Sequence, residues 1–246
     1  MKRLLLIAFD IAIAVYLVLA VSAFNKPDER ATVCSEVKID IDQSQQQGFL
    51  NPAEVKRLLE RHHLYPLAQP MPFISTRQIE ETLRESPYVD DAQCYKTQSG
   101  HVCINLRQRT PLLHVISSNG QQYYIDDHGQ LLPPASFTNG DLIVVTGSVT
   151  QKYATGTLAP IARQLQNDAF WQQQIVQLNV LADGTLELVP RVGDHVVYLG
   201  APTDIPQKLQ RLRKFYKYGL SHAGWNRYER ISVEFGNQII CKKRNP

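Results

Sequence analysis

The 246-residue sequence lacks the short motifs that carry most enzyme chemistry. It contains no G-x-S-x-G nucleophile elbow, no H-E-x-x-H zinc motif, no phosphate-binding P-loop and no G-x-G-x-x-G dinucleotide fingerprint. Internal repeats and low-complexity segments are absent as well. These absences exclude the hydrolases and nucleotide-binding enzymes that such motifs define, and nothing in the sequence predicts a cofactor, a metal ion or a small-molecule substrate. We therefore expect a protein that is not an enzyme.

An excess of charge of one sign is also missing. The chain has 26 Lys and Arg residues against 23 Asp and Glu, which gives a formal net charge of +3. A dedicated nucleic-acid binder presents a clustered basic surface, so nucleic acid is not an expected partner. Charged residues make up 20% and hydrophobic ones 43%, enough apolar material for a folded core. The mean hydropathy of −0.25 excludes a protein with many membrane spans.

Histidine and acidic residues form no convincing metal or catalytic site. His62 and His63 are neighbours near the end of a predicted helix, where they do not share a face and suit the helix dipole instead. Asp126, Asp127 and His128 precede Gly129 in a pattern typical of a turn. A catalytic acid–base pair needs a nucleophile within reach, and the sequence suggests none. We interpret this segment as a turn.

The first residues contain the one long apolar run. Residues 4–24 are almost entirely apolar and would span about 31 Å as a helix, close to the ~30 Å hydrocarbon core of a bilayer. Lys2 and Arg3 precede this run, so a transmembrane helix with a cytoplasmic tail of residues 1–3 is predicted. The alternative is a signal peptide cleaved after Ala23. Asp10 either tilts towards the cytoplasmic interface or contacts another transmembrane helix.

A small β-α-α-β-β unit is predicted to follow, over residues 31–109. Residues 33–42 alternate between apolar and polar, as in a half-buried strand. Asn51, followed by Pro and Glu, begins a first helix, and Ser75 begins a second. Two further strands surround a short turn with a glycine, which indicates a hairpin; they span residues 89–96 and 101–108. The two helices are expected to cover one face of a small sheet.

The sequence has only four cysteines and no C-x-x-C pair, too few to be the framework of a chain this long. Alternation places Cys34 and Cys103 on the face of the sheet away from the helices, and Cys94 on the covered face. In a compartment that permits disulfides, Cys34 and Cys103 are therefore the candidate bridge. The alternative is that all of them are small apolar thiols.

Residues 110–246 predict a second, mixed β domain with two helices, so the fold class of the chain is α+β. The strands are short and separated by Asn-Gly, Asp-Gly and similar turns. One helix carries apolar residues between 158 and 165, and a longer one spans 204–220. The longer helix has a basic face that we interpret as solvated, made of Lys208, Arg211, Lys214 and Lys217. The expected strands are 112–117, 121–126, 129–132, 141–147, 175–181, 185–190, 195–199, 230–235 and 238–242.

This pattern resembles the FtsQ/DivIB family of bacterial cell-division proteins, in which a membrane helix is followed by a POTRA domain and a β domain. The resemblance covers nearly the whole chain and rests on the order and spacing of several segments. These segments are Leu-Arg-Gln-Arg-Thr-Pro at 106–111, Tyr-Tyr-Ile-Asp-Asp-His-Gly-Gln-Leu-Leu-Pro at 123–133, Ile-Val-Val-Thr-Gly at 143–147, Trp225, and Ile-Ser-Val-Glu-Phe-Gly-Asn-Gln-Ile-Ile at 231–240.

The resemblance implies a non-enzymatic scaffold of the divisome. Such a protein sits in the cytoplasmic (inner) membrane at the septum, with its N-terminus in the cytoplasm and its bulk in the periplasm. It recruits bitopic partners of the FtsB and FtsL type, which have periplasmic coiled coils, and so supports septal peptidoglycan synthesis. In the family a partner strand adds to the last strand of the β domain. The positions that match are Glu234, Phe235, Gly236, Asn237, Gln238, Ile239 and Ile240.

Three alternatives stay open on the sequence alone. Phe235 is either part of this partner site or ordinary core, since strand alternation permits both. The chain as a whole is either the membrane scaffold or a secreted periplasmic cell-wall protein released after Ala23. A POTRA-bearing component of a transport system is the third possibility, although the long downstream barrel of such proteins has no room here.

Overall fold

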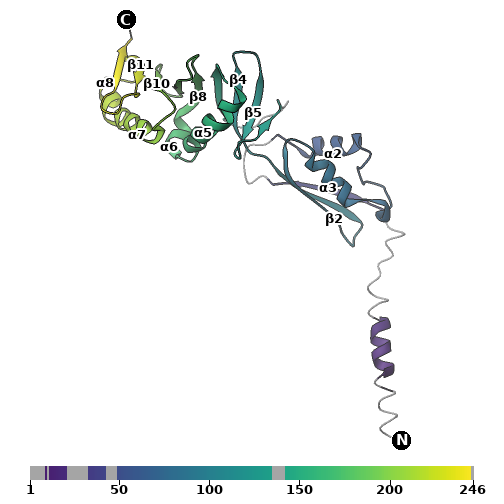
Figure 1. The fold of residues 1–246 in the computed structure, drawn as a ribbon. Helices are drawn as coiled ribbons and strands as arrows, with labels where there is room; N and C mark the ends of the chain where they lie inside the picture. The colour runs from purple at the N-terminus through teal and green to yellow at the C-terminus, as the bar shows by residue number, and fades with distance from the viewer. Residues whose placement is uncertain (1–8, 10, 21–32, 43–48, 135–141, 245–246) are drawn as a thin grey trace. The chain divides into compact units, whose positions relative to one another are not determined.

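We analysed a computed structural model of the chain, which describes residues 9, 11–20, 33–42, 49–134 and 142–244 (Figure 1). The described chain forms two compact units. Of the described residues, the first unit contains those up to Asp42 and Asn51–Arg107, and the second contains Phe49, Leu50 and those from Gln108 on. The boundary expected from the sequence lies between residues 109 and 110.

Residues 11–20 of the predicted membrane segment form a helix. Within the described residues, no helix reaches the length and apolar character that crossing a membrane requires. Much of the predicted span of residues 4–24 lies outside the described residues, as do the predicted tail of residues 1–3 and Asp10.

The first unit has the predicted β-α-α-β-β order. Its three strands form one sheet in the order β1-β3-β2, in which β1 runs parallel to β3. The register pairs Lys38 with Cys103 and Ile41 with Leu106. The elements are β1 (Glu36–Ile41), α2 (Pro52–Arg61), the short 3-10 turn η1 (Met71–Phe73), α3 (Thr76–Arg84), β2 (Val89–Lys96) and β3 (His101–Gln108).

Local capping explains where both helices of this unit begin. The Asn51 side chain accepts a hydrogen bond from the Glu54 amide at 3.0 Å, and the Glu54 carboxylate accepts one from the Asn51 amide at 3.1 Å. This reciprocal pair satisfies two amides that a helix start otherwise leaves unpaired. Ser75 Oγ accepts from the Gln78 amide at 3.3 Å in the same way. Both starts are confirmed as predicted. The helices bury Leu59, Ile79 and Leu83 against Val102, Ile104 and Leu106 of the sheet.

The predicted Cys34–Cys103 bridge is wrong. Cys34 lies before β1, which begins only at Glu36, and its side chain is 1% exposed, whereas Val33 is 48% exposed. The parallel register places Lys38 opposite Cys103, so Cys34 lies about 13 Å further along the strand, beyond the ~7 Å that a bridge allows. All four cysteines are free thiols. Burial raises the pKa of the Cys94 thiol to about 12.

The second unit is built on a nine-stranded mixed sheet, in the order β12-β11-β10-β9-β8-β7-β4-β5-β6. Five of its strand pairs are antiparallel hairpins, and helical connections join parallel neighbours such as β7 and β8. The strands are β4 (Pro111–Ser117), β5 (Gln122–Asp126), β6 (Leu131–Leu132), β7 (Ile143–Gly147), β8 (Ile175–Val180), β9 (Leu186–Pro190), β10 (Val196–Gly200), β11 (Tyr228–Ser232) and β12 (Ile240–Lys243).

The helices of this unit are more numerous than the two that the sequence predicts. The missed helix α6 is only six residues long, too short for a clear apolar period. It begins because the Asp168 side chain accepts hydrogen bonds from the amides of Phe170 and Trp171. Two segments widen to π turns: η3 lies inside the predicted helix 204–220, and η2 precedes the predicted apolar stretch 158–165. The helical elements are α4 (Gln151–Tyr153), η2 (Ala154–Leu158), α5 (Ala159–Gln166), α6 (Ala169–Gln174), α7 (Ile205–Phe215), η3 (Tyr216–Leu220) and α8 (Ser221–Ala223).

One apolar core joins these helices to the sheet. Leu158 and Leu165 of the first helical connection and Leu209 and Leu212 of α7 are all nearly inaccessible to solvent, as is Leu178 at the middle of the sheet. Burying a Leu side chain contributes roughly 1.5–3 kcal/mol, so this shared core sets the position of α7 against the end of the sheet.

Gly147, at the end of β7, is held in a conformation that only glycine fits. Its φ is +96°, and an added Cβ would lie 2.1 Å from the carbonyl oxygen of Val180. We expect Gly147→Ala to lower the free energy of unfolding of the second unit by roughly 1–2 kcal/mol from the backbone conformation and about 1–3 kcal/mol more from the forced overlap. Urea unfolding followed by the fluorescence of Trp171 and Trp225, both in this unit, measures the change.

Gly120 provides the matched control. Its φ of +84° imposes a similar backbone cost, but a Cβ there would meet nothing within 4 Å. Gly120→Ala is therefore expected to be the milder of the two changes. Equal losses in both variants would show that the contact with Val180 has no energetic weight.

Candidate partner-binding site

β12 is the last strand at one end of the nine-stranded sheet. It pairs with β11 in an antiparallel register that sets Ile240 opposite Ser232 and Cys241 opposite Ile231. In the described part of the chain no strand pairs with its other side. Such an edge presents a row of backbone donors and acceptors to any extended segment that approaches it.

Most of the residues predicted for the partner site lie in the connection that precedes this edge, and not in a strand. β11 ends at Ser232 instead of continuing to residue 235, and only Ile240 of the predicted set is part of β12. The ladder with β10 ends at Val233. Its amide still donates to the Tyr198 carbonyl of β10 at 3.0 Å, but its carbonyl accepts from Arg211 of α7 at 2.6 Å.

This connection exposes the aromatic residue that the sequence singled out. Val233 is fully buried, whereas Phe235 is 47% exposed and Ile240 is 49% exposed. The alternative that Phe235 is ordinary core is therefore wrong. Gly236 and Asn237 form the turn that follows, and the chain then returns through Gln238 and Ile239 to the edge strand.

A groove of about 550 Å³ runs between this connection and the helix α7 with its continuation η3. It brings four of the predicted residues, Gly236 to Ile239, together with helical residues that the sequence analysis did not assign to the site. The signal for the helical wall was the basic face of the predicted helix 204–220, which includes Arg211 and Lys214 and which we interpreted as solvated. The helical residues that line the groove are Arg211, Lys214, Phe215, Tyr218 and Gly219.

Lys208 and Arg211, two cations of the face predicted to be solvated, bond to the elements that surround the groove. Lys208 is only 4% exposed, and its ammonium group donates to the Ala201 carbonyl at 2.7 Å. Burial lowers the pKa of Lys208. Arg211 donates to Val233, as described above. Lys208 thus connects α7 to the turn after β10. Arg211 connects α7 to Val233, which leads into the connection that forms the other wall of the groove.

Three aromatic residues lie at the end of α7 and in the π turn η3. One of them, Tyr216, is buried, and the other two, Phe215 and Tyr218, line the groove. Tyr216 is buried, and its hydroxyl lies 2.8 Å from Nε2 of the buried His195. Desolvation lowers the pKa of His195, which favours its neutral form. Tyr218 is 62% exposed, and the Phe215 ring packs so closely over Gly219 that a Cβ there would lie 2.7 Å from it. π turns of this kind often accompany functional sites.

The chemistry of this surface fits binding. It combines an open strand edge, apolar side chains and the cationic groups of Arg211 and Lys214. The thiol of Cys241 in the edge strand is partly buried, and burial raises its pKa, so it is a weak nucleophile.

The Asp126, Asp127 and His128 side chains lie close together, with possible ligand atoms within 4.8 Å of one another. Asp126 is nevertheless committed to other partners. It pairs with Arg109 at 2.9 Å and accepts hydrogen bonds from the amides of His128 at 3.0 Å and Gln130 at 2.7 Å. These contacts confirm the turn that the sequence predicts.

Comparison with known proteins agrees with this architecture. A profile of POTRA-like domains matches residues 32–107, and a profile described as FtsQ/DivIB, C-terminal related, matches residues 110–242. A similar protein is the cell division protein FtsQ of Salinibacter ruber, 24% identical over 180 residues, which are 68% of this chain and 69% of that protein. Because the second profile spans more than half of the chain, the chain belongs to the FtsQ/DivIB family.

Proposed function

We propose that the chain is a non-enzymatic scaffold of the bacterial cell-division machinery. Its family and its similarity to a protein named for cell division support this role. In this proposal the N-terminal apolar segment anchors the chain in the cytoplasmic membrane, with the N-terminus in the cytoplasm. The POTRA-like unit and the β unit then lie in the periplasm, at the division septum.

The partner binds at β12 and the groove beside it. A segment of an FtsB- or FtsL-type protein adds to the open side of β12 through backbone hydrogen bonds, which supply affinity without a particular sequence. Its apolar side chains enter the groove and contact Phe215, Tyr218 and Phe235, and its acidic side chains pair with Lys214. Specificity then comes from the groove and not from the edge.

One observation carries this proposal: the exposed Phe235, the groove residues Gly236–Ile239 and the edge strand β12 follow one another along the chain at the end of the sheet. A chain that places an exposed phenylalanine beside an unpaired strand risks aggregation unless that surface has a partner. The bound partners would in turn support septal peptidoglycan synthesis, so the chain itself needs no catalytic residues.

Depletion of the chain from its host tests the cellular role. We expect cells that continue to grow but fail to divide and become filaments, because a missing scaffold blocks septum formation and not elongation. Microscopy of cell length during depletion measures this, and re-expression of the wild-type chain should restore normal length. Cells that divide at normal length after complete depletion would contradict the role.

Phe235→Asp tests the binding surface. A carboxylate in place of the exposed ring removes the apolar contact and adds a charge beside Glu234, so capture of an FtsB-type partner should fall at least tenfold, about 1.4 kcal/mol or more. Co-purification from crosslinked membranes measures the capture. Leu131→Asp is the matched control, because Leu131 is similarly exposed (41%) but lies on β6 at the other end of the sheet. Undiminished capture by the Phe235 variant would remove this residue from the site.

Gly219→Ala tests the helical wall. The new Cβ would overlap the Phe215 ring, which must then shift within the groove. We expect weaker partner capture, by roughly tenfold or about 1.4 kcal/mol, and an unchanged fluorescence of the buried Trp171. Gly156→Ala is the control: it also lies in a π turn, η2, where a Cβ meets nothing within 4 Å. The two variants should behave differently, and equal capture by both would place the binding surface elsewhere.

A further inference from the structure

The strand β2 lies at one edge of the three-stranded sheet in the first unit. In the order β1-β3-β2, β2 is the outer strand, and no other described strand pairs with its far side. It is eight residues long, longer than an average strand, and so offers an extensive edge for pairing. Unlike β12, this edge is partly occupied by side chains from α3.

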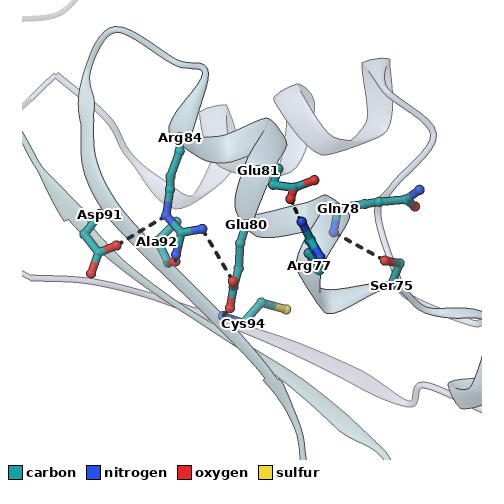
Figure 2. Close-up of polar contacts among 9 residues, drawn as sticks. All are labelled: Ser75, Arg77, Gln78, Glu80, Glu81, Arg84, Asp91, Ala92 and Cys94. Carbon is teal, nitrogen blue, oxygen red and sulfur yellow. Dashed lines mark hydrogen bonds and ion pairs between the residues drawn. The ribbon is translucent and has the colours of Figure 1, made fainter.

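Two outward backbone groups of β2 bond to one pair of side chains. Arg84 donates a hydrogen bond from its guanidinium group to the carbonyl of Ala92, and the amide of Cys94 donates to Glu80 Oε1 at 2.8 Å. Figure 2 shows both side chains reaching from the helix to the strand. Because these bonds involve charged groups, each is stronger than an ordinary backbone hydrogen bond.

The two bonds have the pattern that a neighbouring strand would make. Ala92 and Cys94 flank Gln93, and in an antiparallel ladder the Ala92 carbonyl would accept from one residue of the added strand and the Cys94 amide would donate to the residue two positions away. Arg84 supplies that donor and Glu80 supplies that acceptor. The pair therefore takes the place of two of the hydrogen bonds that a partner strand would make.

The pair is held in this position by further contacts. Arg84 lies 3.5 Å from the Glu80 carboxylate and 3.4 Å from that of Asp91 (Figure 2). The Glu80 side chain is only 25% exposed and that of Arg84 is 42% exposed. A strand that approaches β2 must break both charged hydrogen bonds and move both side chains before it can pair.

We propose that Glu80 and Arg84 close the β2 edge against pairing with the β2 strand of a second copy of this chain. A second copy is the occupant that the edge fits by symmetry, because two identical edges related by a two-fold axis form a self-complementary antiparallel pair. Pairing of the two β2 strands would join the sheets of two copies into one continuous sheet. This device is independent of the proposed cell-division role, since it concerns only the first unit.

The variant Glu80→Ala/Arg84→Ala tests the proposal in the full chain, purified in a mild detergent. At low concentration we expect the Cys94 amide to exchange with deuterium at least tenfold faster than in the wild type, because its acceptor is gone. With rising concentration, sedimentation should show self-association at least tenfold stronger than in the wild type, and the Cys94 amide should become protected again. That second protection identifies β2 as the interface.

The helix provides a matched control in Arg77→Ala/Glu81→Ala. This pair has the same spacing on α3 and a contact of 2.7 Å, but its side chains are 86% and 53% exposed and bond to each other. It should behave as the wild type in both measurements. Glu80→Gln, which keeps an acceptor for the Cys94 amide, should also stay close to the wild type. If the double variant does not fold, Glu80→Ala alone takes its place in both measurements.

A folded Glu80→Ala variant with a fast-exchanging Cys94 amide that sediments like the wild type at every concentration would overturn the proposal. So would self-association that leaves the Cys94 amide unprotected, because the contact would then lie elsewhere. Self-association of the Arg77→Ala/Glu81→Ala control to the same degree would show that loss of charge on α3, and not access to β2, causes it.

Discussion

The hydrogen bonds of Val233 are the interaction on which the site of the second unit depends. Its amide still bonds to β10, but its carbonyl accepts from Arg211 of α7, so the ladder with β10 ends at this residue and the chain returns to the sheet only at Ile240. The intervening residues become a connection that exposes Phe235 and forms one wall of the groove. Arg211 belongs to α7, whose other residues form the opposite wall, so one side chain sets the spacing of the two walls.

The edge strands β12 and β2, one in each unit, differ in the partners of their outer backbone groups. β12 has no strand on its outer side within the described chain and lies beside an exposed aromatic surface. The outer groups of β2 at Ala92 and Cys94 bond instead to Arg84 and Glu80. The same physical requirement, that backbone donors and acceptors find partners, yields an available edge in one unit and an occupied one in the other.

Local features of the fold were predictable because neighbours in the sequence determine them. Asn51 and Ser75 mark the starts of their helices through bonds that span only three residues, and alternation identified the buried face of β3. The Cys34–Cys103 bridge was wrong because it depends on the register between β1 and β3, which alternation does not reveal. The helix α6 was missed because six residues are too few for a period to be visible. Lys208 was placed in solvent because its distant partner, the Ala201 carbonyl, leaves no trace in the pattern of the helix.

The sequence by itself determined the order of elements, the POTRA-like and β units, and the family, because these follow from periodicity, capping and spacing along the chain. It also pointed to the segment around Phe235. Only the tertiary structure decided that this segment is a connection beside the edge strand, that α7 and η3 form the second wall of the groove, and that side chains of α3 cover β2. Each of these depends on hydrogen bonds between residues far apart in the sequence, whose partners are chosen by packing and not by their neighbours.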